Sequence, residues 1–197
     1  MRGKKILYFV LGFLCFIIAQ PLLRFPLLEW LNQNPDFTLA YMMNPPLIGV
    51  LIALSAGIFE ETFRFLFKLL LMKPDRCAIS QPILFGLGHG IAEACVVLLP
   101  AVSIFSISSL ALLERLLAVI FHVTVTIVVW NGFQGNKKVL YLLLAILLHG
   151  MMDALIPIIS SFTTSLIIFE GAFLIVDIFM VIYAFHSRKY YLKEENQ

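Results

Sequence analysis

Two adjacent glutamates and an arginine interrupt one of the most apolar stretches of the chain, GIFEETFRFLF at residues 57–67. Glu60 and Arg64 are spaced i,i+4 and Glu61 and Arg64 i,i+3, so either pair can neutralise charge along one helix face. A charged side chain at mid-membrane costs about 2.5–3.5 kcal/mol on insertion scales, so such groups pair internally and mark a functional site. The stretch therefore indicates either an internal ion pair with no further task or one wall of a polar active site.

Three of the four histidines also lie within apolar stretches. His89 and Glu93 in GHGIAE, and His149 and Asp153 in HGMMD, are spaced i,i+4, so each histidine can keep a carboxylate one turn away. Such a partner fixes the imidazole tautomer and supports its charged form. His122, in ERLLAVIFH, is the third. Each histidine could instead have a purely structural role, with its ring bonded to a backbone carbonyl. If all three rings lie at one depth in the membrane, a common functional site is favoured over this alternative.

The rest of the composition indicates that these side chains lie in a bilayer. Of the 197 residues, 61% are hydrophobic and 13% are charged, about half the charged fraction of a soluble domain. A spanning helix needs roughly 20 apolar residues. Six segments meet this requirement: 6–23, 47–72, 79–99, 110–130, 139–160 and 164–185. The sequence therefore predicts an all-α integral membrane protein, with one transmembrane helical domain over 1–197 and an outer loop at 24–46 in which Pro26 starts a short helix.

The side chains suited to chemistry fall at one depth in these spans. The depth of each residue follows from the rise of 1.5 Å per residue along its predicted helix. Measured from the helix ends on one side of the membrane, it is about 13–18 Å for Glu60, His89, His122 and His149. Four helices thus bring them to one layer, which predicts a polar catalytic chamber within the bundle. Small residues next to the histidines let backbones or a substrate approach closely. These are Gly86, Gly88, Gly90 and Gly150.

Charge placement predicts that both termini are cytoplasmic. If the chain starts inside and crosses at each span, ten of the 14 lysines and arginines fall in cytoplasmic segments, as the positive-inside rule requires. These ten are Arg2, Lys4, Lys5, Lys73, Arg76, Lys137, Lys138, Arg188, Lys189 and Lys193. The topology explains the small net charge of +2, so no nucleic-acid partner is expected. We predict a multi-pass protein of the cell membrane.

Three motifs of the chain resemble those of the CPBP superfamily of intramembrane proteases, which includes CAAX proteases and bacteriocin-processing enzymes. They are EETFR at 60–64, FGLGH at 85–89 and HGMMD at 149–153. The combination AGIFEETFR, GLGHGIAE, ERLLAVIFH and HGMMDA is most similar to the YhfC-like branch of bacterial intramembrane peptidases, over about residues 20–185. The resemblance implies an intramembrane endopeptidase of the bacterial cytoplasmic membrane that hydrolyses a membrane-associated peptide or protein.

Carried onto the matching positions, the resemblance implies that Glu60 is a general base for water and that His89 assists it. His149 then faces the negative charge that develops on the substrate oxygen. Glu61 is left to pair with Arg64, although spacing alone allows the reverse assignment. The superfamily commonly spaces its arginine three residues beyond the glutamate pair, whereas here two residues intervene.

The remaining polar residues of the motifs take supporting roles in this interpretation. Glu93 and His122 are expected to support the catalytic residues. Asp153 replaces the asparagine often found at its position, and an ionised aspartate has no proton to donate to an oxyanion. We therefore expect Asp153 to orient His149, to stay protonated or to bind a metal.

Zinc chemistry is an alternative to this mechanism. The superfamily is mostly described as metal-free, so the resemblance implies no cofactor, although the YhfC-like branch has also been labelled metalloprotease. Three histidines and a glutamate suit the open, four-coordinate zinc of catalytic sites. In that case the expected ligands are Glu60, His89, His122 and His149.

Two other function classes stay open at this point. A chain of carboxylates and histidines at the membrane midplane is also typical of proton relays, so a proton- or ion-coupled transporter is one of them. The sequence shows no inverted repeat of the kind that many transporters have. A non-catalytic membrane scaffold is the other. The expected partners are the lipid bilayer and a membrane-associated substrate, and the sequence makes no prediction about oligomeric state.

Overall fold

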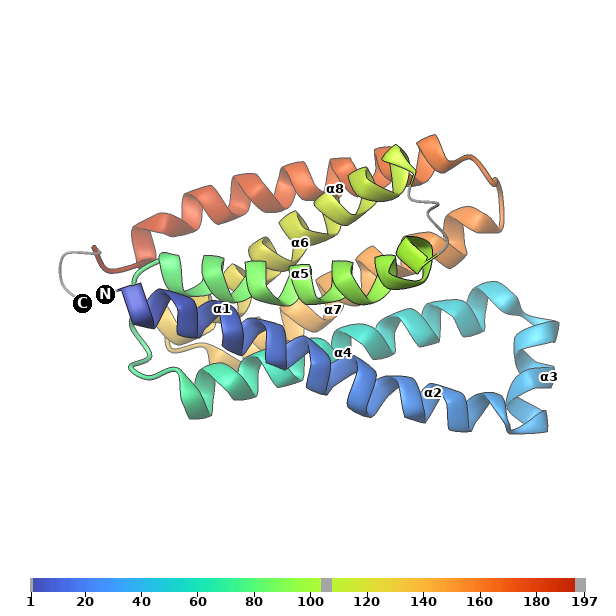
Figure 1. Cartoon of the computed structure of the whole chain (residues 1–197), viewed down its shortest axis with the longest axis horizontal. Helices are drawn as coiled ribbons and strands as arrows, with labels where there is room; N and C mark the ends of the chain where they lie inside the picture. The colour runs from blue at the N-terminus through green and yellow to red at the C-terminus, as the bar shows by residue number, and fades with distance from the viewer. Residues whose placement is uncertain (1, 104–107, 194–197) are drawn as a thin grey trace.

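The structure is a computed structural model that describes residues 2–103 and 108–193. The described parts form a helical bundle (Figure 1). Six of its helical stretches are long and apolar enough to cross a membrane: Gly3–Asn32, Pro45–Leu71, Ser80–Leu99, Ser109–Gln134, Lys138–Ser160 and Leu166–Tyr190. The prediction of an all-α membrane protein with about six spans is confirmed.

The helices follow one another with short joints. In chain order they are α1 (Arg2–Ile17), the π-helical η1 (Ile18–Arg24), α2 (Phe25–Asn32), α3 (Pro35–Met43), α4 (Pro45–Leu71), α5 (Ser80–Ser103), α6 (Ser109–Gln134), α7 (Lys138–Ser160), α8 (Leu166–Ser187) and the 3-10 turn η2 (Arg188–Tyr190). Helices α4 to α8 occupy the five later predicted spans, with shifts of a few residues at their ends. The long helices alternate in direction, so α1 begins and α8 ends at the same end of the bundle, opposite α3 (Figure 1).

The expected outer loop at 24–46 is instead helical over most of its length. Helix α2 continues α1 and η1 without a break, and this first stretch of 30 residues is about 45 Å long, well beyond a 30 Å hydrocarbon core. Two Asn-Pro pairs then start new helices. The side chain of Asn34 caps α3 and that of Asn44 caps α4, each followed by a proline that needs no hydrogen-bond partner in the first turn.

The helices that carry the polar residues pack side by side. Helix α1 packs on α5, α5 on α6, α6 on α7 and α7 on α4, while α8 lies outside against α6. Glycines bring α1 and α5 together: a Cβ built on Gly88 would lie 2.0 Å from the carbonyl oxygen of Phe9, and one on Gly12 1.9 Å from that of Phe85. The close approach expected near the histidines is therefore present.

We expect Gly88→Ala to lower the free energy of unfolding by about 1–3 kcal/mol, because its methyl group collides with rigid backbone and forces α1 away from α5. The matched control is Gly171→Ala, since nothing lies within 4 Å of the Cβ that it would add on α8. Both substitutions raise helix propensity by the same amount. The difference between their unfolding free energies therefore measures the collision of the methyl group added at position 88 with α1. Denaturant unfolding in detergent measures it, and equal stability of the two variants would contradict the prediction.

Candidate functional site

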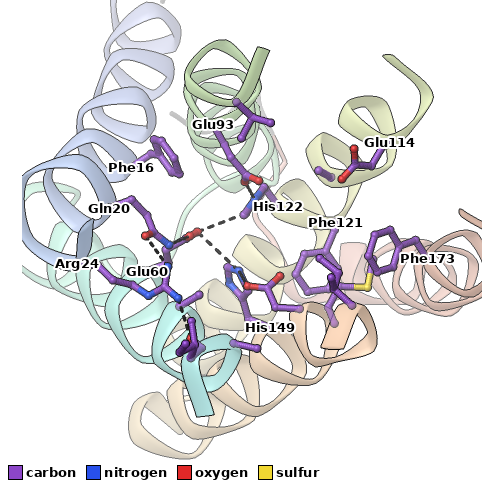
Figure 2. A pocket seen from close by; sticks show the side chains of 18 of the residues that line it. Phe16, Gln20, Arg24, Glu60, Glu93, Glu114, Phe121, His122, His149 and Phe173 are labelled. Atoms are coloured by element: carbon purple, nitrogen blue, oxygen red, sulfur yellow. Dashed lines mark hydrogen bonds and ion pairs between the residues drawn. The ribbon is translucent and has the colours of Figure 1, made fainter. Parts of the chain in front are cut away.

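Three side chains from three helices converge at mid-bundle. Glu60 of α4, His122 of α6 and His149 of α7 are all buried, with 2–3% of each residue exposed. The Oε2 atom of Glu60 lies 3.8 Å from His122 Nδ1 and 3.8 Å from His149 Nε2. Each residue offers one metal-ligating atom, and these atoms lie within 4.8 Å of one another. Figure 2 shows Glu60 facing both rings across the pocket.

His89 of α5 joins the same layer in a different way. Its Nε2 atom is 2.8 Å from Glu60 Oε2, and its ring packs against Phe16 and His122 with centroid distances of 5.4 and 4.9 Å. The group that converges as possible metal ligands consists of Glu60, His122 and His149. Of the four residues expected for zinc, His89 therefore stands apart from the others as a partner of Glu60.

A buried carboxylate holds the second nitrogen of His149. Glu61 Oε1 is 2.6 Å from His149 Nδ1, and Arg64 Nη1 donates to the same oxygen at 2.5 Å. This is the pairing of Glu61 with Arg64 that the resemblance implied and that spacing alone left open. Arg64 also donates from Nη2 to His122 Nδ1 at 3.2 Å. It therefore links Glu61, the partner of His149, to His122.

A second carboxylate holds His122, and it comes from a neighbouring helix. Glu93 of α5 bonds His122 Nε2, and Arg115 of α6 donates to Glu93 Oε1 at 2.8 Å and to Glu114 Oε1 at 2.6 Å. The i,i+4 spacing had assigned Glu93 to His89. His89 and Glu93 lie one turn apart on α5 and both point into the bundle. There Glu93 bonds His122 of α6, and His89 bonds Glu60 of α4.

Asp153 is the most exposed acidic group of the layer. Its side chain is 37% exposed and lines the pocket, and its Oδ2 atom lies 3.8 Å from His149 Nε2. This distance is too long for a hydrogen bond. Asp153 therefore faces the pocket near His149, while Glu61 orients the ring.

Gln20 and Arg24 of the first span also belong to the site, and sequence reasoning missed both. Gln20 Nε2 donates to Glu60 Oε1 at 2.5 Å, and Arg24 Nη1 donates to Gln20 Oε1 at 3.0 Å. Figure 2 shows the two side chains on the side of Glu60 away from the histidines. The sequence did offer a signal, because Gln20 and Arg24 are two polar residues spaced i,i+4 at the end of an apolar segment. Arg24 was assigned to the outer loop because the first span was predicted to end at residue 23.

A cavity of about 370 Å³ leads from this layer to one end of the bundle. Its lining on the four central helices comes from 49–60, 93–97, 114–122 and 149–157, each at the site layer or on the side where α3 lies. On the other side of the layer, buried side chains of the described residues pack together. There Lys68 is buried and donates to the carbonyl oxygens of Met72 and Pro74 and to Gln81 Oε1, so all three of its protons are bonded.

The donor chemistry of the three converging residues fits zinc. Arginine can only donate, so its bond to His122 Nδ1 means that this nitrogen carries a lone pair. A nitrogen has one such lone pair, so a zinc ion bound there would replace the Arg64 hydrogen bond. A carboxylate at His149 Nδ1 places the proton there and leaves the lone pair on Nε2. Both lone pairs thus belong to the nitrogens that face Glu60. Two histidines and a glutamate are a known ligand set of catalytic zinc, and a carboxylate behind each histidine is its usual support.

Comparison with known proteins points the same way. The chain is 26% identical over 188 residues to a protein of Bacillus subtilis (strain 168) named uncharacterized membrane protein YhfC, covering 77% of this chain and 72% of that protein. The wider CPBP resemblance stays a prediction. A family model described as YhfC intramembrane metalloprotease matches residues 2–112 and 97–171. The chain therefore belongs to the YhfC intramembrane metalloprotease family.

Proposed function

We propose that this protein is an intramembrane peptidase whose site binds zinc through Glu60, His122 and His149. The observation that carries the proposal is that one ligating atom each of Glu60, His122 and His149 converge within 4.8 Å in a buried layer. The lone pair of His149 Nε2 is available to zinc, and that of His122 Nδ1 becomes available when Arg64 gives up its hydrogen bond. The family description supports it. A zinc ion in such a site polarises a peptide carbonyl and supplies a water nucleophile near neutral pH.

The other residues of the layer then take defined tasks. Glu61 and Glu93 hold the protons of the two imidazoles and keep the ring orientations fixed. His89 holds Glu60 through Oε2. Asp153 is the most exposed of the carboxylates that line the cavity, so we propose that it accepts the proton from the attacking water and passes it to the leaving amine.

A metal-free peptidase is the second candidate, and one contact favours it. The 2.8 Å bond between His89 Nε2 and Glu60 Oε2 is the arrangement in which a histidine assists a glutamate base. In this version Glu60 takes the proton from water directly, and His149 faces the substrate oxygen. The two candidates differ in what a chelator does.

The deciding experiment measures metal and cleavage on the same sample. The protein is purified in detergent, its zinc is quantified by mass spectrometry, and a panel of membrane peptides is tested for cleavage. We expect about one zinc per chain, loss of cleavage with a strong chelator and recovery on adding zinc. Cleavage that persists without metal supports the glutamate mechanism. Proton flux in liposomes without cleavage of any peptide supports a transporter instead and would falsify the peptidase.

We further propose that the substrate reaches the site from the outer side of the membrane. Lys137 is an exposed cation between α6 and α7, at the end of the bundle where α1 begins. The lining of the cavity extends towards the opposite end. We expect a cysteine at Ser161 to react with an impermeant maleimide in intact cells, and one at Lys137 only after permeabilisation. Both positions are exposed, so the reverse pattern would show the opposite orientation.

A further inference from the structure

The first span changes from α-helix to π-helix where it passes the site. Segment Ile18–Arg24 is π-helical and contains Pro21, and Phe25 donates its backbone N–H to the Gln20 carbonyl oxygen, a wide i,i+5 turn. Proline has no N–H and its ring crowds the preceding turn, which explains the local widening. Such turns are frequent at functional sites. Gln20 and Arg24 are buried here, while the intervening Leu22 is 62% exposed.

Partner chemistry fixes the orientation of the Gln20 amide. Arg24 can only donate, so the oxygen of Gln20 faces Arg24 and its NH₂ group faces Glu60. Arg24 is itself anchored on α4, where Nε donates to Ser55 Oγ at 2.9 Å and Nη2 donates to the Ile52 carbonyl oxygen at 2.7 Å. A series of hydrogen bonds thus runs from Ser55 and Ile52 of α4 through Arg24 and Gln20 and returns to α4 at Glu60.

We infer that Gln20 is a positioning residue for Glu60 and that Arg24 fixes Gln20 in this role. The inference rests on the proposed zinc site. Gln20 engages Oε1 of Glu60, while Oε2 is bonded to His89. Oε2 also lies 3.8 Å from a ring nitrogen of His122 and of His149. An amide donor suits a carboxylate ligand in the same way that a carboxylate acceptor suits a histidine ligand.

This role completes a pattern shared by the three candidate ligands. Each ligand bonds a polar side chain that is in turn bonded by an arginine, and Glu60 is bonded by His89 as well. The chains are Glu60–Gln20–Arg24, His149–Glu61–Arg64 and His122–Glu93–Arg115. The arginines come from η1, α4 and α6, so the first span contributes to the centre as directly as the helices that carry the sequence motifs.

The test compares two buried glutamines. We expect Gln20→Leu to weaken zinc binding about tenfold or more and to shift the visible absorption of the cobalt-substituted protein. The control is Gln81→Leu: Gln81 is 3% exposed and accepts from Lys68 and Trp130 on the side of the layer away from the cavity. We expect Gln81→Leu to lower the melting temperature without changing zinc affinity. Unchanged zinc affinity in Gln20→Leu, or an equal change in both variants, overturns the inference.

A metal-free measurement separates this inference from the proposed function. If the wild type binds no zinc, the metal centre fails, and the contact is judged by unfolding in the presence of chelator. The free energy of unfolding is measured for a double-mutant cycle of Gln20→Leu, Glu60→Leu and the variant with both changes. Either single change already removes the contact between the two side chains, so the double variant should lose less stability than the sum of the two single losses. We expect such non-additive stabilities. Additive stabilities would mean that Gln20 does not hold Glu60.

Discussion

The His122→Ala protein is expected to purify without zinc and to cleave membrane peptides about 10⁴-fold more slowly than the wild type. The reason is that Nδ1 of His122 is one of three converging ligand atoms, and Glu60 and His149 alone give an incomplete set. The fold is expected to survive, because Glu93 keeps its ion pair with Arg115 when the imidazole is removed. Zinc per chain and the cleavage rate are measured on the same preparation.

Two other histidines serve as controls for this result. His186 is exposed at the end of α8 and bonds the carbonyl oxygen of Ile182, so His186→Ala should keep both zinc and cleavage. His89→Gln is the more discriminating variant, because His89 contacts Glu60 without joining the ligand group. We expect it to retain zinc. A His122→Ala protein with full zinc content, or a His89→Gln protein with none, would require a different ligand set.

The architecture could be predicted from the sequence because bilayer thickness restricts it. Six apolar segments of sufficient length leave few alternatives to six helices. The common depth of Glu60, His122 and His149 followed from helical rise alone, and the structure brings these three side chains together. The segment 24–46 was predicted to be an outer loop with one short helix starting at Pro26. Here its Asn-Pro pairs begin helices, since Asn34 and Asn44 cap them.

The partners of the histidines could not be predicted from spacing along one chain. A carboxylate at i+4 is a neighbour on an isolated helix, but in a bundle the residues of adjacent helices compete for it. Gly86 illustrates why they succeed: a Cβ built there would lie 2.6 Å from Val123 Cα, so α5 and α6 touch beside His122. Glu93 therefore reaches His122 across this contact. Gln20 is uncharged, and its i,i+4 partner Arg24 was placed outside the first span, so neither was selected as a site residue.

The arginines behind the ligands also determine how the buried charges are tolerated. Glu61 and Arg64 have no exposed surface, and a buried ion of one sign without a partner is costly in a low-dielectric interior. Each arginine at the site faces a carboxylate directly or through Gln20, so the buried charges are compensated by pairs. The stability of the bundle and the geometry of the site consequently depend on the same residues.

Arg64→Met is expected to lower the free energy of unfolding by about 3–5 kcal/mol, the usual result of removing one partner of a buried ion pair. Methionine fills much of the space of the arginine, so the loss comes mainly from Glu61, whose charge is left without its 2.5 Å partner. His122 Nδ1 loses a donor as well. Denaturant unfolding in detergent with chelator present measures the effect on the protein without metal.

The double variant Glu61→Gln with Arg64→Met shows whether uncompensated charge is the cause. It contains neither member of the ion pair, yet the glutamine oxygen can still accept from His149 Nδ1. Replacing a whole buried pair by neutral groups is often close to neutral for stability, so we expect most of the loss to be recovered. Zinc affinity should stay reduced, because an amide supports the imidazole less strongly than a carboxylate does. If the double variant is no more stable than Arg64→Met alone, the role of Arg64 lies in packing, and charge compensation does not explain its place beside Glu61.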